Sequence, residues 1–210
     1  MNRRPPPEDT HGATEPVTPR PSASLLLLRG GSTSLEVLLV QRTPAARFMG
    51  GFWVFPGGAV EPADRAGTDD DGAHRAAAVR ELAEEASVEG VDPDGLVAFS
   101  RWVTPVGGRI RYDTRFFLGP APEGAEPRVD GEECVDAAWF APSAALQAYD
   151  RDELALVFPT VKTFEAIAPF ATAAELLEAS RGRVVEPIRP QVVDDRIVLP
   201  GEPGYIEDAG

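Results

Sequence analysis

Cysteine is almost missing from this chain, which has Cys134 alone among its 210 residues. A single cysteine excludes an intramolecular disulfide and a zinc cluster built on thiolates. Neither of the two histidines, His11 and His74, has a sequence context that suggests a Cys-His pair. We therefore expect Cys134 to pack as a small apolar residue, with a catalytic thiol as the alternative.

Long apolar runs are missing as well. No run approaches the roughly 20 residues that a membrane-spanning helix requires, and the leucine run at 25–28 suits a buried strand. The Arg3-Arg4 start is followed by prolines and polar residues, where a signal peptide would have an apolar region. These features predict a cytoplasmic protein without a membrane segment.

Positive charge is scarce, and Lys162 is the one lysine among 20 basic residues. The formal net charge of −14 argues against generic binding to a nucleic-acid backbone or to an anionic membrane. A phosphorylated small molecule stays compatible with this charge, because bound metal and local arginines can reverse the field inside a cleft.

Carboxylates are gathered on one predicted helix. At 100° per residue, one side of this helix carries Val79, Leu82, Ala83 and Ala86, and the opposite side carries Glu81, Glu84 and Glu85. Glutamates at these spacings repel one another by roughly 0.2–0.5 kcal/mol per pair. A divalent cation such as Mg²⁺ or Mn²⁺ would turn that repulsion into ligation, and a solvated acidic face is the alternative.

A glycine turn precedes the helix. Residues 55–58, Phe-Pro-Gly-Gly, have the composition of a strand end followed by a tight turn. Such glycines let the backbone approach a ligand and offer a carbonyl to a metal ion. Arg80 stands beside Glu81 and has the planar geometry that holds a carboxylate bidentately. The turn and the acidic helix together favour a metal site over a solvated surface.

These residues resemble the signature of the Nudix hydrolases, a glycine followed by REUxEExGU in which U is aliphatic. The matching residues are Gly58, Arg80, Glu81, Leu82, Glu84, Glu85 and Val88. The chain departs from the signature in having Ser87 for its last glycine and Asp64 for a glutamate. It also has fifteen residues between Asp64 and Arg80 where the family signature, called the Nudix box, usually has seven. Residues 64–73 are expected to form a surface excursion before the helix.

The resemblance implies an α/β fold, a Nudix-type α/β/α sandwich with a mixed β-sheet. The expected Nudix domain, with its C-terminal helices, spans 22–182. The proline-rich and polar composition of residues 1–21 predicts a disordered arm, and the prolines after residue 182 predict an extended tail at 183–210. Two or three Mg²⁺ ions, or Mn²⁺, would be held by Glu81, Glu84, Glu85 and the Gly57 carbonyl. Arg80 would orient Glu81 or Glu84, and either Glu85 or Glu133 would accept the proton. A homodimer is a further expectation from the family.

The segment before the box resembles that of the coenzyme A diphosphatases in the same family. Arg42 and Arg47 follow an apolar run there, and they could neutralise phosphates of a nucleotide-like ligand or be ordinary loop residues. Arg111 and Arg115 lie on a clearly alternating strand, 109–118, and either form a substrate wall or pair with nearby acids. The implied substrate is coenzyme A or acyl-CoA. ADP-ribose, NADH and a non-catalytic nucleotide sensor are the alternatives.

The remaining elements follow from turn and helix signals. Strands are expected at 22–28 and 35–41, joined as a hairpin. Helices are expected at 142–149, 151–158, 160–168 and 172–182, the last one opened by a capping box. Residues 157–160 line an acyl or adenine pocket or pack in the core. Residues 184–204 contain three prolines and should be extended, with an edge strand at 196–199.

Overall fold

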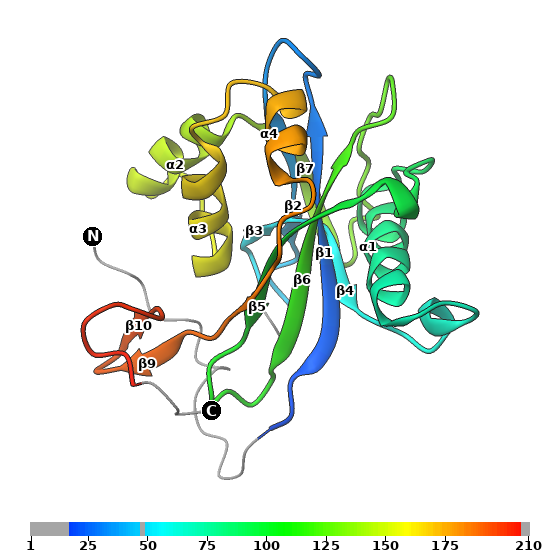
Figure 1. Cartoon of the computed structure of the whole chain (residues 1–210). Helices are drawn as coiled ribbons and strands as arrows, with labels where there is room; N and C mark the ends of the chain where they lie inside the picture. Colours follow the sequence, from blue (N-terminus) through cyan, green and yellow to red (C-terminus); the bar gives the residue numbers. More distant parts are fainter. Residues whose placement is uncertain (1–16, 47–48, 207–210) are drawn as a thin grey trace.

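A mixed sheet forms the centre of the computed structural model, which describes residues 17–46 and 49–206. Helix α1 covers one face of the sheet, and α2, α3 and α4 lie on the other side (Figure 1). The strands of this sheet are β1 (Arg20–Arg29), β2 (Glu36–Arg42), β3 (Trp53–Val54), β4 (Gly57–Ala59), β5 (Val97–Val103), β6 (Tyr112–Pro120), β7 (Cys134–Phe140) and β8 (Pro187–Ile188). The helices are α1 (Asp70–Ala86), α2 (Pro142–Asp150), α3 (Phe158–Ile167) and α4 (Ala173–Ser180).

The sheet runs in the order β3-β2-β1-β6-β5-β8, with β4 paired to β1 and β7 paired to β2. β1 runs parallel to β6 and β5 runs parallel to β8, whereas the other pairs are antiparallel. A separate hairpin joins β9 (Gln191–Val193) to β10 (Arg196–Val198). The predicted α/β/α sandwich with a mixed sheet is therefore confirmed.

Strand β1 divides the core into two layers because successive side chains point to opposite faces of a sheet. Leu26 and Leu28 pack into the cluster that includes Phe164 of α3 and Leu176 of α4. Leu25 and Leu27 pack into the cluster that includes Leu82 of α1. Cys134 is fully buried in the second cluster, and burial raises the pKa of its thiol to about 12. This confirms that Cys134 packs as a small apolar residue.

Helix α1 begins where Asp69 caps it by accepting a hydrogen bond from the Gly72 N–H. It ends at Ser87, which is in the left-handed region and donates its N–H to the Ala83 carbonyl. The excursion predicted at 64–73 is therefore shorter than expected, because residues 70–73 already belong to the helix. Only 64–69 stay outside it, and the first two of these residues belong to a short 3₁₀ turn at Ala63–Arg65.

The prediction of a helix at 151–158 is wrong. α2 ends at Asp150, Asp152 has a positive φ of 56°, and α3 begins only at Phe158. The segment between them pairs with the main sheet, since Trp53 N–H donates to the Ala155 carbonyl. The other three predicted helices and the hairpin of the first two strands are confirmed. Thr172 also caps α4 as the predicted capping box requires.

The C-terminal segment carries more structure than a simple extended tail. β8 joins the main sheet beside β5. The strand predicted at 196–199 is present as Arg196–Val198, which pairs with β9 in a separate two-stranded sheet. Residues 1–16 of the predicted arm lie outside the described residues, and the domain limits stay predictions. Within 17–46 and 49–206, none of the helices combines the length and apolar character of a membrane span.

We expect Leu82→Ala to lower the free energy of unfolding by about 2–5 kcal/mol, because Leu82 is fully buried between α1 and β1. Chemical denaturation monitored by circular dichroism measures this loss. Leu177→Ala is the matched control, since Leu177 of α4 is only partly buried and should give a smaller loss. Equal losses for the two variants would contradict the assignment of α1 to the core.

Candidate active site

The glycine turn and the acidic helix meet directly. Gly57 N–H donates to Oε2 of Glu85 at 2.9 Å. At Gly58, an added Cβ would lie 2.2 Å from Oε1 of Glu81. A side chain at position 58 would therefore push Glu81 away. At Gly57, an added Cβ would lie 2.4 Å from the Ala23 carbonyl oxygen of β1. Gly58 is therefore needed because the Glu81 carboxylate approaches the backbone of β4, and Gly57 because β1 does.

Glu85 lies on the buried side of α1 and is only 3% exposed. The prediction that Glu85 points away from the core is therefore wrong. Burial raises its pKa to about 7, and the neighbouring Glu81 adds to this shift. Among the described residues, the cation that pairs with Glu85 is Arg42, whose Nη1 lies 3.4 Å from Oε1. Burial likewise raises the pKa of Glu81, although Arg80 beside it acts in the opposite direction. Two largely desolvated carboxylates thus lie one helical turn apart, each with one arginine beside it.

Arg80 organises the exposed edge of this cluster. Its Nε and Nη2 donate to the two carboxylate oxygens of Asp64 at 3.1 and 3.0 Å, and Nη2 also donates to the Ala59 carbonyl. Its Nη1 donates to Glu81 at 2.9 Å and to Glu84 at 2.8 Å. The bidentate partner of Arg80 is therefore Asp64, one of the departures from the family signature.

Asp64 has a structural part in the site that the sequence left uncertain. Burial raises the pKa of Asp64, but hydrogen bonds from Arg80 and the Glu61 N–H outweigh burial and bring it below the ordinary value. The aspartate is therefore charged and fixed beneath the guanidinium. Through Arg80, it holds Glu81 and Glu84 in place.

The donor chemistry of the cluster fits a divalent cation. Glu81 and Glu85 present oxygen ligands, which Mg²⁺ and Mn²⁺ prefer, and the two carboxylates lie beside Gly58 and Gly57 respectively. Glu84 is exposed and turned toward Arg80, and in the described part of the chain no three His, Cys, Asp or Glu side chains are already arranged as a metal-binding group. A cation would thus be held first by Glu81 and Glu85, and Glu84 would join by leaving Arg80.

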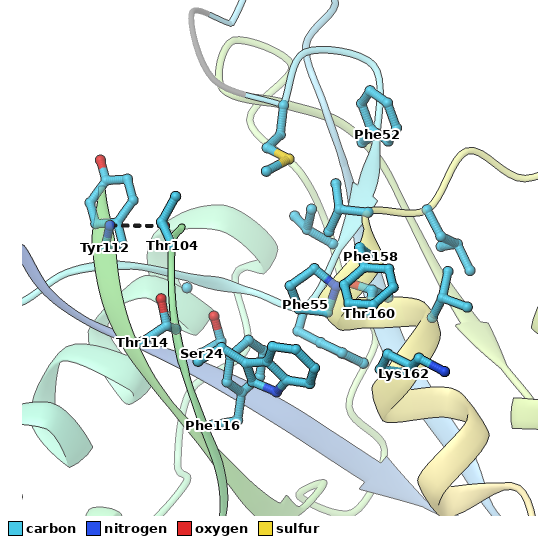
Figure 2. Close-up of a pocket in the computed structure, with 18 of the residues that line it drawn as sticks. Ser24, Phe52, Phe55, Thr104, Tyr112, Thr114, Phe116, Phe158, Thr160 and Lys162 are labelled. Carbon is cyan, nitrogen blue, oxygen red and sulfur yellow. Dashed lines mark hydrogen bonds between the residues drawn. The ribbon is translucent and has the colours of Figure 1, made fainter. Parts of the chain in front are cut away.

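A cavity of about 1350 Å³ opens in front of these carboxylates. Glu81, Glu85, Gly57, Arg42 and Glu133 all line it. Glu133 belongs to the turn before β7, whose backbone is held by hydrogen bonds to Asp130. Figure 2 shows the cavity between residues of the sheet, such as Ser24 and Thr114, and residues at α3, such as Phe158 and Thr160.

The four predicted substrate arginines have separate locations. Arg42 lies in the cavity, and its Nε is buried without a hydrogen-bond partner among the described residues. Arg111 donates to the backbone carbonyls of Thr104 and Val17, and Arg115 pairs with Asp70 and Asp71 at the start of α1. Neither of these two lines the cavity. Arg47 lies outside the described residues.

The sequence predicted some of the other cavity-lining residues but not all. Residues 157–160 were expected to line a pocket or pack in the core, and they line the cavity. Four further lining residues had no signal in the sequence, namely Trp102, Pro190 just before β9, and Val192 and Ile197 of the hairpin. They come together only through strand pairing and tertiary packing, so no local spacing could have identified them.

Known proteins share this fold and sequence pattern. The NUDIX domain family matches residues 18–161. The structure of a NUDIX hydrolase from Alicyclobacillus acidocaldarius has a TM-score of 0.68 and 28% identity, over 77% of this chain and 96% of that one. Acyl-coenzyme A diphosphatase NUDT19 of Homo sapiens is 32% identical over 120 residues, which are 53% of this chain and 32% of that protein. Putative nudix hydrolase 7 of Caenorhabditis elegans is 26% identical over 90% of this chain and 75% of its own length.

The sandwich fold and the glycine turn beside an acidic helix define the class of protein. Together with the family match over more than half of the chain, these features show that this chain belongs to the Nudix family. The family predicted from the residues is confirmed. The alignment with the human diphosphatase spans only about a third of that protein's length.

We expect Arg80→Lys to weaken Mn²⁺ binding by about 10- to 100-fold, because a lysine cannot hold Asp64 bidentately while orienting Glu81. Titration calorimetry measures this affinity. Arg101→Lys is the matched control, because Arg101 holds Asp113 through Nε and Nη2 in the same way but lines no part of the cavity. A similar loss in both variants would show that Arg80 has no special part in cation binding.

Proposed function

We propose that this protein is a divalent-cation-dependent hydrolase of coenzyme A or acyl-CoA. It cuts the diphosphate linkage to release 3′,5′-ADP and a phosphopantetheine or acyl-phosphopantetheine product. The observation that carries the proposal is the buried Glu85 and the partly buried Glu81 at the glycine turn, which open on one large cavity. Adjacent carboxylates that both line a cavity are oxygen donors suited to a hard cation.

Each residue of the site has a distinct role in the reaction. When bound, the cation supplies Lewis-acid stabilisation of charge on the diphosphate and activates water for attack. Glu81 and Glu85 hold it, with Glu84 and the Gly57 carbonyl as additional ligands. Arg80 is a positioning residue that keeps Glu81 and Glu84 oriented. Either Glu85 or Glu133 accepts the proton from water, since both line the cavity.

Arg42 supports an anionic substrate. Its guanidinium lies in the cavity beside Glu85, and its buried Nε has no partner within the described residues. A donor left unpaired in this way costs free energy unless a ligand or water satisfies it. A phosphate oxygen of the substrate provides such an acceptor, with a charge-assisted hydrogen bond.

The size and chemistry of the cavity favour a substrate that extends well beyond its diphosphate group. Carboxylates lie at one end, and aromatic and aliphatic side chains such as Phe158 and Ile197 line other parts. Coenzyme A joins a charged diphosphate to a long, mostly uncharged arm, which suits both environments. The resemblance to an acyl-coenzyme A diphosphatase points to the same substrate class. Cytoplasmic location and a homodimer stay predictions from the sequence.

We expect the wild-type protein with Mg²⁺ to release 3′,5′-ADP from CoA and acyl-CoA. Glu85→Gln should lower the rate by about 10²- to 10⁴-fold, because it removes a cation ligand and a candidate base. Chromatographic product analysis over a panel of CoA, acyl-CoA, ADP-ribose, NADH and 8-oxo-dGTP measures this. Glu36→Gln is the control, since Glu36 pairs with Arg29 and does not line the cavity.

Two results would overturn the proposal. A wild-type protein inert on the whole panel would remove the enzyme assignment. Cleavage of ADP-ribose or NADH alone would retain a Nudix hydrolase but replace the coenzyme A substrate, and it would also remove the assignment of Arg42 to a coenzyme A phosphate.

A further inference from the structure

The cavity extends across the sheet, well beyond the carboxylates. A row of paired residues leads from β4 to β8: Ala59 pairs with Ser22, Ser22 with Thr114, Thr114 with Trp102, and Trp102 with Ile188. Four strand-to-strand steps of roughly 4.8 Å span about 19 Å. Ser22, Thr114 and Trp102 line the cavity along this row. A ligand whose diphosphate lies at the glutamates can therefore reach from β4 toward β8 in an extended conformation.

The chemistry of the wall changes along this path. Near the glycine turn it offers carboxylates, Ser22 and Ser24, whereas at the far end it offers Trp102, Val103, Pro190, Val192 and Ile197. Three of these apolar residues belong to the β9–β10 hairpin or the residue before it. Figure 1 shows this hairpin apart from the main sheet, below α2 and α3 in that view. Lys162 and Glu165 of α3 also line the cavity, where they pair with each other, and Lys162 lies over the ring of Phe158. The hairpin side of the far end is apolar and suits an uncharged group.

The hairpin is tied to the residues that follow it. Gln191 exchanges two hydrogen bonds with the backbone of Ile206, and the Tyr205 hydroxyl donates to the Arg189 carbonyl. Val192 pairs with Ile197 across the hairpin, and both line the cavity. The last described residues thus stabilise the local structure of the hairpin.

The hairpin lies outside the part of the chain that matches the Nudix family. That match ends at residue 161, whereas the hairpin spans 191–198. This part of the cavity lining therefore lies beyond the residues matched by the family model. Trp102 beside it is nine-tenths buried, and its Nε1 has no hydrogen-bond partner among the described residues. An amide-bearing arm passing Trp102 offers an acceptor for that donor.

We propose that the β9–β10 hairpin forms the end wall of a subsite for the apolar tail of the substrate and sets the acyl-chain length that the protein accepts. This inference rests on the proposed function, because it assumes an acyl-CoA whose diphosphate lies at Glu81 and Glu85. The arm follows the row of Ser22, Thr114 and Trp102, and the acyl group ends against Val192 and Ile197. Val192 and Ile197 are specificity residues that take no part in the chemical step.

The test compares two neighbouring valines. Val192 lines the cavity, whereas Val193 does not, because successive side chains of a strand point to opposite faces. We expect Val192→Trp to lower the ratio of kcat/KM for dodecanoyl-CoA to that for free CoA by about 10-fold or more. Val193→Trp should leave the ratio as in the wild type. Val192→Ala, which enlarges the far end, should shift the preference toward longer chains and remains informative if the tryptophan variant does not fold.

The outcomes separate the two proposals. If the wild type cleaves CoA and acyl-CoA but no Val192 variant changes the chain-length profile, the hairpin inference is overturned and the proposed function stands. The same holds if Val192→Trp lowers kcat/KM equally for every chain length. If the wild type cleaves neither CoA nor any acyl-CoA, both proposals fail together.

Discussion

The contact between two glutamates, Glu85 buried and Glu81 partly buried, and a glycine turn is the constraint on which the rest of this structure depends. Glu85 accepts the Gly57 N–H, and Glu81 lies where a side chain of residue 58 would be. Burial raises the pKa values of both carboxylates, although Arg42 and Arg80 act in the opposite direction. A fold selected for stability alone would avoid such a pair, because the cost of desolvating charged groups can exceed what their ion pairs return. The sheet and α1 hold the pair in place, so that the stability cost is met by packing elsewhere.

That packing explains why the layers are arranged as they are. Leu82 and the alanines of α1 lie against β1, which fixes the rotation of the helix and therefore the direction of Glu81 and Glu85. The same strand reaches the opposite layer through Leu26 and Leu28 and pairs with β4 through residues 22–24. β1 thus links the glycine turn, the acidic helix and the cavity wall. A displacement of α1 would move the carboxylates relative to Gly57, so a substitution in the core beneath α1 could disrupt the site without changing any of its residues.

Local signals in the sequence were enough to find the centre of the site but not its surroundings. The glycine turn, Arg80 and the glutamate spacing are fixed by one turn and one helix, so they can be recognised without tertiary information. The burial of Glu85 could not, because a helical pattern treats glutamate as a solvated residue and the contact with Gly57 is 28 residues away. The prediction of a helix at 151–158 fails for a similar reason, because the Ala155 carbonyl of this segment accepts a hydrogen bond from Trp53 N–H instead of one within a helix. Trp102 and the β9–β10 hairpin meet only through strand pairing.

The lengthened box shows how the site tolerates change. The inserted residues between Asp64 and α1 would loosen the helix start if nothing spanned them, yet Asp64 and Arg80 clamp the two sides of the loop with a bidentate pair. Asp70 and Asp71 also pair with Arg115 of β6, which fastens the first turn of α1 to the sheet. The arginine read from the sequence as a candidate substrate contact thus anchors the helix in this structure. With both ends of α1 held, the loop can lengthen while the spacing of Glu81 and Glu85 from the glycine turn stays the same.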